Sequence, residues 1–373
     1  PTTRPTQTRP KQQPSDGSPV TMRVAVDSAP LLDPPTGVGR YVRELIRSLE
    51  SHGLDVVRYA VALRGRPDEP LERLRLPARL VQASWRRFNR PFIESLVGAV
   101  DVVHATNFVL PALGRTPGVL TIHDLSFLRD DTFPGGERLR YLVPWSLERA
   151  SLVVTPTRAV ADELVEYFEF DEDRVTVTHE GIAPHFFGAG RLSERALGRM
   201  GIPGPFVMAL GTIEPRKNLP RLLEAWNVVR GELDGWRLVI AGPQGWGQEL
   251  PETEGVLLLG RVAEETLPGL LAAAEIFCYP SLYEGFGLPP LEAMAAGTAA
   301  LVGAYPAAAE VLGDAALLVD SLSSEALAEG LRMLAGDADA RKRLAMRGKA
   351  RALTFTWEQT GRQTVAAYRR VAG

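Results

Sequence analysis

The 373-residue sequence has a single cysteine, Cys278, which lies in the apolar run IFCY. One thiol forms no intramolecular disulfide, so neither a disulfide framework nor a cysteine-based metal site is available. We expect Cys278 to be a small buried side chain. No apolar run approaches the roughly 20 residues that cross a bilayer. With a net charge of −3, nothing in the overall charge favours a nucleic acid partner.

Apolar residues are also scarce at the start of the sequence, where prolines stand among threonine, glutamine, lysine and arginine. Without an apolar centre this segment does not match a secretory signal, and we expect residues 1–21 to be a disordered tail. The whole sequence is 45% hydrophobic and 23% charged, which is an ordinary composition for a soluble globular protein. Its length suits two domains.

Short apolar runs alternate with helical patterns along the chain. This alternation favours right-handed βαβ crossovers, parallel sheets and an α/β fold. A glycine-rich interruption at residues 181–204 is the expected linker between two such series. The expected strands are 23–27, 54–62, 101–104, 119–124, 152–155, 175–178, 206–210, 236–241, 256–259, 276–279, 299–302 and 315–319. The expected helices include 138–150, 159–170, 219–230, 288–296, 324–334, 338–353 and 357–371.

Two glutamates stand in the segment SLYEGFGLPPLEAM, residues 281–294. Glu284 falls in a glycine-rich turn after an apolar strand, and Glu292 falls in the helix that follows. Ligands of open α/β sheets bind at this carboxyl edge. An isolated pair of this kind is usually a turn residue and a solvated helix residue. The tyrosine, glycines and prolines packed around this pair favour a binding site instead.

Two further segments are candidates for anion binding. Gly37 and Gly39 precede a helix that places Val42 and Leu45 on one face, and amides at such a helix start can hold a diphosphate or simply shape a turn. The third glycine of a dinucleotide fingerprint is missing, because Val42 stands in its place. Arg216 and Lys217 precede another helix, whose dipole already makes that end positive. An anion such as a diphosphate is expected to offset them, unless they are simply exposed.

Polar residues follow the expected strands at 101–104 and 119–124. His104, Asn107, His123 and Asp124 therefore lie at the sheet edge where ligands gather. A lone histidine is more often structural, but His123 stands in the sequence HDLSF, followed by Phe133 and Pro134.

These segments together resemble the retaining, nucleotide-sugar-dependent glycosyltransferases of family 4, which have the GT-B fold. The resemblance is carried by SLYEGFGLPPLEAM, which matches a Glu-x7-Glu signature, by a GxGRY element at residues 37–41, by HDLSF and by GTIEPRKNLPRLLEAW. In the last element, Thr212 stands where the family commonly has an arginine. The residues leave open which guanidinium contacts the phosphate, and Arg216 is our choice.

The resemblance implies two Rossmann-like domains that face a central cleft. The two domains are an N-terminal acceptor domain (22–185) and a C-terminal donor domain (186–356). A final helix (357–373) crosses back to the first domain. By the same resemblance, Glu284 and His123 contact the transferred sugar, Glu292 contacts the ribose, and Lys217 and Arg216 contact the diphosphate. The other implied donor-binding residues are Gly37, Gly39, Gly211, Thr212, Gly242, Arg261, Gly285, Phe286, Gly287 and Leu288.

The resemblance implies retaining transfer of a hexose from a nucleoside-diphosphate sugar to a glycan or lipid-linked acceptor. Mannose and GDP-mannose are the favoured sugar and donor. One alternative is a sugar-nucleotide epimerase of the same fold, with His104 or His123 as general base. Another is a non-catalytic nucleotide-sugar-binding protein. Because leaving-group stabilisation dominates such catalysis, Glu284→Ala and Lys217→Ala are predicted to abolish most turnover while leaving the melting temperature within a few degrees.

No catalytic metal and no other cofactor are expected. Asp-x-Asp triplets occur at residues 171–173 and 337–339, but the first precedes a strand and the second lies between helices, which is the wrong context for a metal held at a strand end. Residues 71–90 carry six arginines, with Trp85 and Phe88 interleaved. This segment is either a solvated helix with two core aromatics or a peripheral contact with anionic lipid. We therefore expect a cytoplasmic protein, with the inner face of a membrane as a candidate contact.

Overall fold

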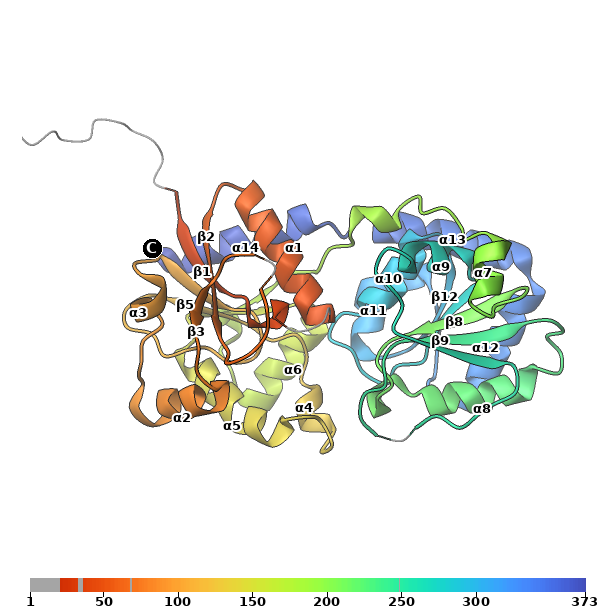
Figure 1. Ribbon diagram of the computed structural model, residues 1–373, viewed down its shortest axis with the longest axis horizontal. Coiled ribbons are helices and arrows are strands. Elements are labelled where there is room, and N and C mark those ends of the chain that lie inside the picture. Colours follow the sequence, from red (N-terminus) through yellow and green to blue (C-terminus); the bar gives the residue numbers. More distant parts are fainter. Residues whose placement is uncertain (1–20, 33–35, 68, 248) are drawn as a thin grey trace, which may run out of the picture.

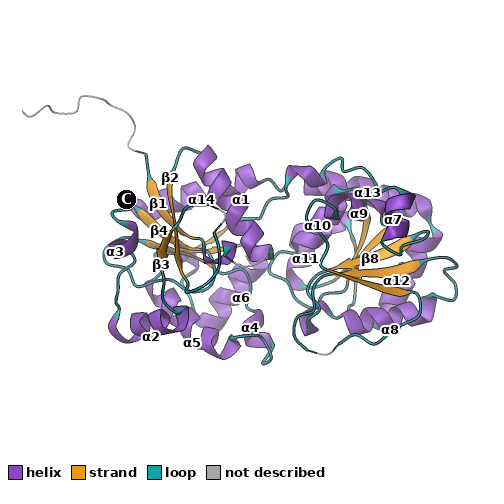
Figure 2. Ribbon diagram, in the orientation of Figure 1, coloured by secondary structure: helices purple, strands orange, loops and turns teal. Residues whose placement is uncertain are grey.

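The computed structural model describes residues 21–32, 36–67, 69–247 and 249–373. Apart from Thr21, the predicted tail lies outside the described residues. The chain forms two α/β lobes, each a parallel sheet covered by helices (Figures 1 and 2). We call them the N lobe and the C lobe.

The N lobe holds a seven-stranded sheet of order β3-β2-β1-β4-β5-β6-β7. Every pair of neighbouring strands in it is parallel. The edge strand β3 was not predicted, because it is only three residues long and its first two residues are charged. The strands are β1 Arg23–Asp27, β2 Asp55–Val61, β3 Glu72–Leu74, β4 Val102–Ala105, β5 Gly118–Thr121, β6 Leu152–Thr155 and β7 Val175–Val177.

The helices α1, α3, α5 and α6 of the N lobe contact strands of this sheet. In α1, Val42, Leu45 and Leu49 are buried, as their spacing predicted. Gly37 and Gly39 lie inside the first turn of α1, whereas the sequence placed them before it. The helix starts earlier because the Thr36 hydroxyl caps it by accepting from the Gly39 amide. The helices are α1 Gly37–Ser51, α2 Ala78–Phe88, α3 Glu94–Val97, α4 Ser126–Arg129, α5 Gly136–Arg149 and α6 Arg158–Phe168.

The C lobe holds a six-stranded sheet of order β10-β9-β8-β11-β12-β13, also parallel throughout. Buried side chains form one cluster on each face of this sheet, and Cys278 lies in one of them. The strands are β8 Phe206–Leu210, β9 Arg237–Ala241, β10 Val256–Gly260, β11 Ile276–Tyr279, β12 Ala299–Gly303 and β13 Leu317–Val319. The helices are α7 Glu194–Arg199, α8 Leu219–Val229, α9 Leu267–Ala273, α10 Leu288–Ala295, α11 Pro306–Leu312, α12 Ser324–Gly336 and α13 Ala338–Ala352.

The last helix, α14 Trp357–Ala372, packs on α1 in the N lobe, and Figure 1 shows the two side by side. Trp357, Val365 and Tyr368 join the same buried cluster as Tyr41 and Leu45. The chain crosses from the C lobe close to Gly181, where an added Cβ would lie 2.2 Å from the Trp357 backbone nitrogen. Short 3-10 turns occupy Ala29–Leu31, Glu172–Arg174, Pro184–Phe186, Pro215–Lys217 and Gly313–Ala315.

Candidate active site

The candidate site lies where the strand order of each sheet reverses. The reversal falls between β1 and β4 in the N lobe and between β8 and β11 in the C lobe. Loops after the carboxyl ends of such strands form a crevice that binds ligands in open α/β sheets. Arg216 and Lys217 follow β8, and Glu284 follows β11. The segment after β1 leads into α1 and Arg40.

Glu284 is the centre of a buried group of polar side chains. Its Oε1 accepts hydrogen bonds from the Lys217 ammonium at 2.6 Å, the Tyr279 hydroxyl at 2.8 Å and the Ser281 hydroxyl at 2.6 Å. Its Oε2 pairs with Arg216. The Glu284 side chain is only 8% exposed, so these partners replace the water that an ionised carboxylate needs.

The charges of this group determine its ionisation. Burial disfavours the ionised form, but Arg216 and Lys217 outweigh burial and lower the pKa of Glu284 to about 2. Burial and the neighbouring Arg216 lower the pKa of Lys217. Glu284 is therefore a carboxylate at neutral pH, held in place by two cations.

Arg216 and Lys217 are half-buried and paired, so the alternative that they are exposed basic residues is wrong. Arg216 also pairs with the buried Glu214 at 2.7 Å. Sequence reasoning expected an external anion to offset the two cations and did not predict that Glu284 would contact both. No local pattern indicates this contact, because more than sixty residues separate Glu284 from the two cations.

Glu292 lies on α10, is 2% exposed and faces the N lobe. There it forms an ion pair with Arg40 of α1. Arg40 also lies 3.6 Å from Glu264. Burial raises the pKa of Glu292, and Arg40 opposes that shift. Arg40 was not a predicted site residue, although it is the arginine of the GxGRY element, because its partner is 252 positions away.

His123 lies on the N-lobe side of the site and is 9% exposed. Its Nε2 is 2.9 Å from the Thr106 carbonyl oxygen, and its Nδ1 is 3.4 Å from the carboxylate of the buried Glu180. The ring meets Tyr41 edge-on, with 4.7 Å between centroids. Sequence reasoning did not single out Glu180, which follows β7 in the segment THEGI.

His104 does not reach the cleft. It is fully buried, with Nδ1 2.6 Å from the Tyr368 hydroxyl and Nε2 2.7 Å from the Thr121 hydroxyl. Burial lowers the pKa of His104 to about 3. His104 is thus a neutral core residue, and its proposed role as an accessible general base is wrong.

The predicted glycines occupy two kinds of position. The Gly39 amide already donates to the Thr36 hydroxyl at 3.1 Å, so the expectation that it is free for a phosphate is wrong, whereas a Cβ on Gly37 would meet nothing within 4 Å. Gly211 and Gly242 press the loops after β8 and β9 together, since a Cβ on Gly242 would lie 1.9 Å from the Gly211 oxygen. Thr212 follows directly in the loop after β8.

The remaining predicted residues flank Glu284 or follow β10. Gly285 lies against the N lobe, and Gly287, with φ +97°, begins α10 in a conformation that favours glycine. Phe286 and Leu288 belong to the buried core of the C lobe, so packing accounts for both of them. Arg261 follows β10 and is exposed.

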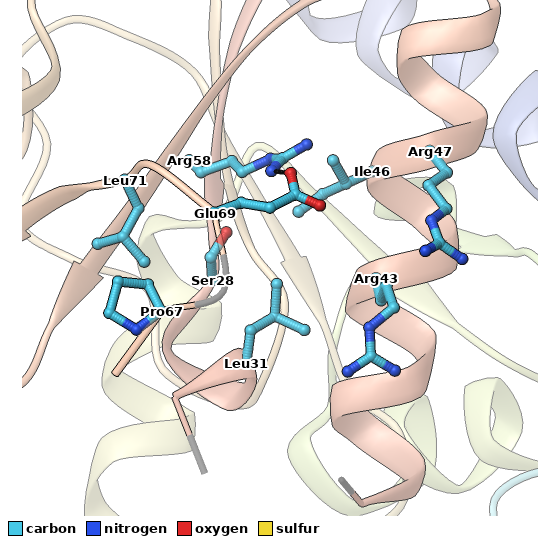
Figure 3. Close-up of a pocket in the computed structure, with 9 residues that line it drawn as sticks. All are labelled: Ser28, Leu31, Arg43, Ile46, Arg47, Arg58, Pro67, Glu69 and Leu71. Atoms are coloured by element: carbon cyan, nitrogen blue, oxygen red, sulfur yellow. Dashed lines mark ion pairs between the residues drawn. The ribbon is translucent and has the colours of Figure 1, made fainter. Parts of the chain in front are cut away.

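Two hollows in the described part of the chain bear on the site. One of about 200 Å³ lies beside Lys217 and is also lined by Gly211 and Tyr279, among others. A larger one of about 470 Å³ lies in the N lobe between α1 and the segment after β2, away from Glu284. Figure 3 shows its lining, with Arg58 and Glu69 paired in the middle and Arg43 and Arg47 on α1. Glu284 lines neither hollow, but Lys217 and Tyr279, which both donate to it, line the smaller one.

Residues 21–32, 36–67, 69–247 and 249–373 contain neither a cluster of metal ligands nor a helix that could span a membrane. No three histidine, cysteine, aspartate or glutamate side chains there gather closely enough to hold a metal ion. No helix in the same residues combines the length and the hydrophobicity needed to traverse a bilayer. The two Asp-x-Asp triplets serve helix starts, since Asp171 accepts from the Asp173 amide and Asp337 accepts from the Ala340 amide.

Comparison with known proteins covers both lobes. The family model described as "Glycosyltransferase Family 4" matches residues 35–186, and the one described as "Glycosyl transferases group 1" matches residues 202–351. The chain is 30% identical to O-antigen chain mannosyltransferase B of Escherichia coli, over 93% of this chain and 100% of that protein. It is 28% identical to D-inositol 3-phosphate glycosyltransferase of a Nocardioides species, over 93% of this chain and 89% of the relative.

Solved structures share the fold at lower identity. Sucrose-phosphate synthase from Thermosynechococcus elongatus superposes with a TM-score of 0.74 at 19% identity, covering 94% of this chain and 98% of that one. HepE of Anabaena, solved in complex with UDP-glucose, gives a TM-score of 0.72 at 17% identity, with 94% and 100% covered. The predicted arrangement of two Rossmann-like domains is confirmed. The chain therefore belongs to glycosyltransferase family 4 and is a glycosyltransferase with the GT-B fold.

Proposed function

We propose that this glycosyltransferase moves a hexose, with mannose favoured, from a nucleoside-diphosphate sugar to a glycan or glycolipid, with retention of configuration. The observation that carries the proposal is the contact of Glu284 with Arg216 and Lys217 at the strand-order reversal of the C lobe. Similarity to O-antigen chain mannosyltransferase B and to the serotype-specific mannosyltransferase WbdA, both of Escherichia coli, supports mannose as the sugar. GDP-mannose is the donor that we propose for it.

Arg216 and Lys217 are the groups we assign to the departing diphosphate. Both lie at the start of α8, where the helix dipole adds positive potential. A diphosphate entering the adjoining hollow would share their hydrogen bonds with Glu284. Preorganised cations of this kind stabilise leaving-group charge without reorganisation, and losing one such donor commonly costs on the order of 10²-fold in rate.

Glu284 suits the binding of a sugar hydroxyl better than nucleophilic attack. Three donors converge on Oε1 of Glu284. Among the described residues, Oε2 accepts a hydrogen bond from Arg216 alone. A carboxylate oxygen has two acceptor sites, so Oε2 can accept one more hydrogen bond. We assign that bond to a hydroxyl of the hexose, with His123 on the opposite wall. The acceptor would then attack from the face that the diphosphate leaves.

Glu292 is the residue we assign to the ribose. Its carboxylate is paired with Arg40 across the cleft, so a nucleotide that takes this carboxylate displaces or shares Arg40. We further propose that transfer needs no metal, because both Asp-x-Asp triplets serve as helix caps. EDTA should leave the rate unchanged, and a loss restored by Mg²⁺ would contradict this.

The epimerase alternative needs a general base in the cleft. The burial of His104 removes one of the two candidates. The other, His123, has its Nε2 beside a carbonyl oxygen and its Nδ1 beside Glu180. A binding protein without activity remains the second alternative, and it is separated from the enzyme by the assay below.

We also propose a peripheral contact with anionic lipid at the inner face of a membrane, made by a surface of α2 and α5 that we call the α2–α5 patch. Only one of the two interleaved aromatics is in the core: Trp85 is 5% exposed and Phe88 is 67% exposed. The pKa of Arg138 is lowered first by burial and then by the positive charge of Arg79. Arg79 and Arg138 are therefore close neighbours. The patch consists of Leu80, Phe88, Tyr141, Arg79, Arg86, Arg87 and Arg138.

Basic side chains among exposed apolar ones suit an anionic lipid surface. The test is sedimentation with phosphatidylcholine vesicles that contain or lack phosphatidylglycerol. Arg86→Ala/Arg87→Ala should lower binding to the anionic vesicles severalfold. The control Arg195→Ala/Arg199→Ala, on exposed α7, should not. Equal binding by both variants, or no binding by the unmodified protein, would remove the proposal.

The donor proposal is tested by thermal unfolding with GDP, UDP and dTDP. A nucleotide at 100 times its dissociation constant stabilises the folded state by about 2.7 kcal/mol. We expect the largest rise in melting temperature with GDP, and release of GDP from GDP-mannose when acceptor is added. A larger rise with UDP would contradict GDP-mannose and favour a UDP-sugar as the donor. No shift with any nucleotide would favour the non-catalytic alternative, and isomerised sugar nucleotide without diphosphate release would favour the epimerase.

A further inference from the structure

Tyr283, the residue directly before Glu284, reaches from the C lobe into the N lobe. Its hydroxyl accepts a hydrogen bond from the Leu125 backbone amide at 2.9 Å and donates one to Oε2 of Glu163 at 2.7 Å. The guanidinium of Arg129 lies 4.6 Å from the centre of its ring. The side chain is 6% exposed, so these contacts are shielded from water.

The N lobe holds these partners ready for the tyrosine. Arg129, on α4, donates to Oε1 of Glu163, on α6, from Nε at 3.0 Å and from Nη2 at 2.7 Å. This fork fixes the carboxylate and leaves Oε2 for Tyr283. Burial, followed by Asp124, raises the pKa of Tyr283. The hydroxyl therefore keeps its proton and can donate across the cleft at all ordinary pH values.

Tyr283 touches the C-lobe half of the proposed site through its backbone and the N-lobe half through its hydroxyl. Its carbonyl oxygen accepts from Nη1 of Arg216 at 3.1 Å. Leu125, which donates to its hydroxyl, is two positions after His123. On the other side of Glu284, the Gly285 carbonyl accepts from the hydroxyl of Thr157 in the N lobe at 2.8 Å. The turn that carries Glu284 is thus held by the N lobe at both ends.

We propose that Tyr283 is a positioning residue, which ties the approach of the two lobes to the placement of Glu284 and Arg216. The inference rests on the proposed function of those two residues. Tyr283 itself does not contact the reacting atoms. When the lobes are apart, the Tyr283 hydroxyl has no N-lobe partner and the turn is held from the C lobe alone. When they meet, the hydrogen bonds to Leu125 and Glu163 set the turn. Small misplacements at a reacting centre cost large factors in rate, so this coupling affects turnover.

The test compares Tyr283→Phe, Glu163→Ala and the double variant. The matched control is Tyr167→Phe, which removes an exposed hydroxyl from the same helix as Glu163. The substrate is the sugar nucleotide whose diphosphate gives the largest thermal shift, and the readout is its slow cleavage by water, followed as diphosphate release. Nucleotide affinity and the radius of gyration from small-angle scattering are measured in parallel.

Each single variant should cleave the donor about tenfold more slowly. Nucleotide affinity should stay within about twofold, because Glu292 lies outside the turn and Arg216 keeps its ion pairs with Glu214 and Glu284. The double variant should be no slower than the slower single variant, because the two groups act as one unit. The radius of gyration should rise in both single variants and stay unchanged in Tyr167→Phe.

Three results would overturn the inference: unchanged cleavage in Tyr283→Phe, independent losses that multiply to about a hundredfold in the double variant, or a loss of nucleotide affinity as large as the loss of rate. Glu163 is partly exposed, so we expect Glu163→Ala to fold. This variant therefore tests the inference even if Tyr283→Phe unfolds. Failure of the unmodified protein to bind any nucleotide would instead count against the proposed function.

Discussion

Glu284 combines a predicted catalytic role with a structural one. The sequence predicted that its loss would affect turnover and barely affect stability. The structure buries its carboxylate between Arg216 and Lys217, and removing one partner of a buried ion pair typically costs about 3–5 kcal/mol because it leaves the other charges unpaired. Melting temperature alone therefore does not separate catalysis from folding at this residue.

The pH dependence of stability does separate the carboxylate charge from its shape. Glu284→Gln keeps the volume and removes the charge. The folded-state pKa of Glu284 is about 2, below its ordinary value of 4.5, so ionisation stabilises the fold above pH 4.5, by about 3 kcal/mol. This contribution disappears as pH falls toward 2. We expect the wild type to be more stable than Glu284→Gln at pH 7, and the gap to narrow between about pH 4.5 and pH 3.

Denaturant unfolding at several pH values measures the gap. The control is Glu252→Gln, since Glu252 is exposed and its variant should follow the wild type throughout. A gap that widens on acidification, or no gap at pH 7, would show that the two cations do not depress the pKa of Glu284.

Among the helices, α14 has the clearest structural role. It leaves the C lobe and closes the N-lobe core over α1, through Trp357, Val365 and Tyr368. Its contact with the sheet includes the hydrogen bond between the Tyr368 hydroxyl and Nδ1 of His104 on β4. Both groups are buried, so neither can bond to water instead.

Tyr368→Phe isolates that hydrogen bond. It leaves Nδ1 of His104 without a partner in the core, which costs about 1–3 kcal/mol. We expect the melting temperature to fall by several degrees while nucleotide affinity stays within about twofold. Tyr141→Phe, which alters an exposed tyrosine, should leave the melting temperature unchanged. An unchanged melting temperature in Tyr368→Phe would mean that the position of α14 does not depend on this hydrogen bond.

In the whole molecule, one place where the two lobes pack closely is Gly285. A Cβ at this position would lie 1.7 Å from the His123 carbonyl oxygen, which is far inside van der Waals contact. Only glycine therefore allows the Glu284 turn to meet the His123 loop. This contact joins the part of the site in one lobe to the part in the other.

Gly285→Ala is predicted to hold the lobes apart. We expect a larger radius of gyration and a loss of turnover of at least about tenfold, with nucleotide affinity within about threefold because the residues proposed to contact the ribose and the phosphates lie in the C lobe. The control is Gly190→Ala, where a Cβ meets nothing within 4 Å. Equal scattering and equal turnover in both variants would contradict a requirement for this close approach.

The sequence by itself determined the α/β class and the order of the predicted strands and helices, because both follow from short-range periodicity. It did not predict the short helices α3, α4, α7, α9 and α11. It also located Glu284, Arg216 and Lys217 after strand ends and Glu292 in the helix that follows Glu284, because the carboxyl edge of a parallel sheet follows from strand order. It missed β3, whose short charged segment carries no apolar pattern.

The tertiary structure alone decided which of these groups pair. Arg40 with Glu292, Glu284 with the two cations, and Tyr283 with Glu163 each join segments more than sixty residues apart. It also showed that His104 is buried and that Thr36 already binds the Gly39 amide. Such contacts depend on how the two lobes and distant strands pack together. The spacing of residues within one segment does not determine that packing.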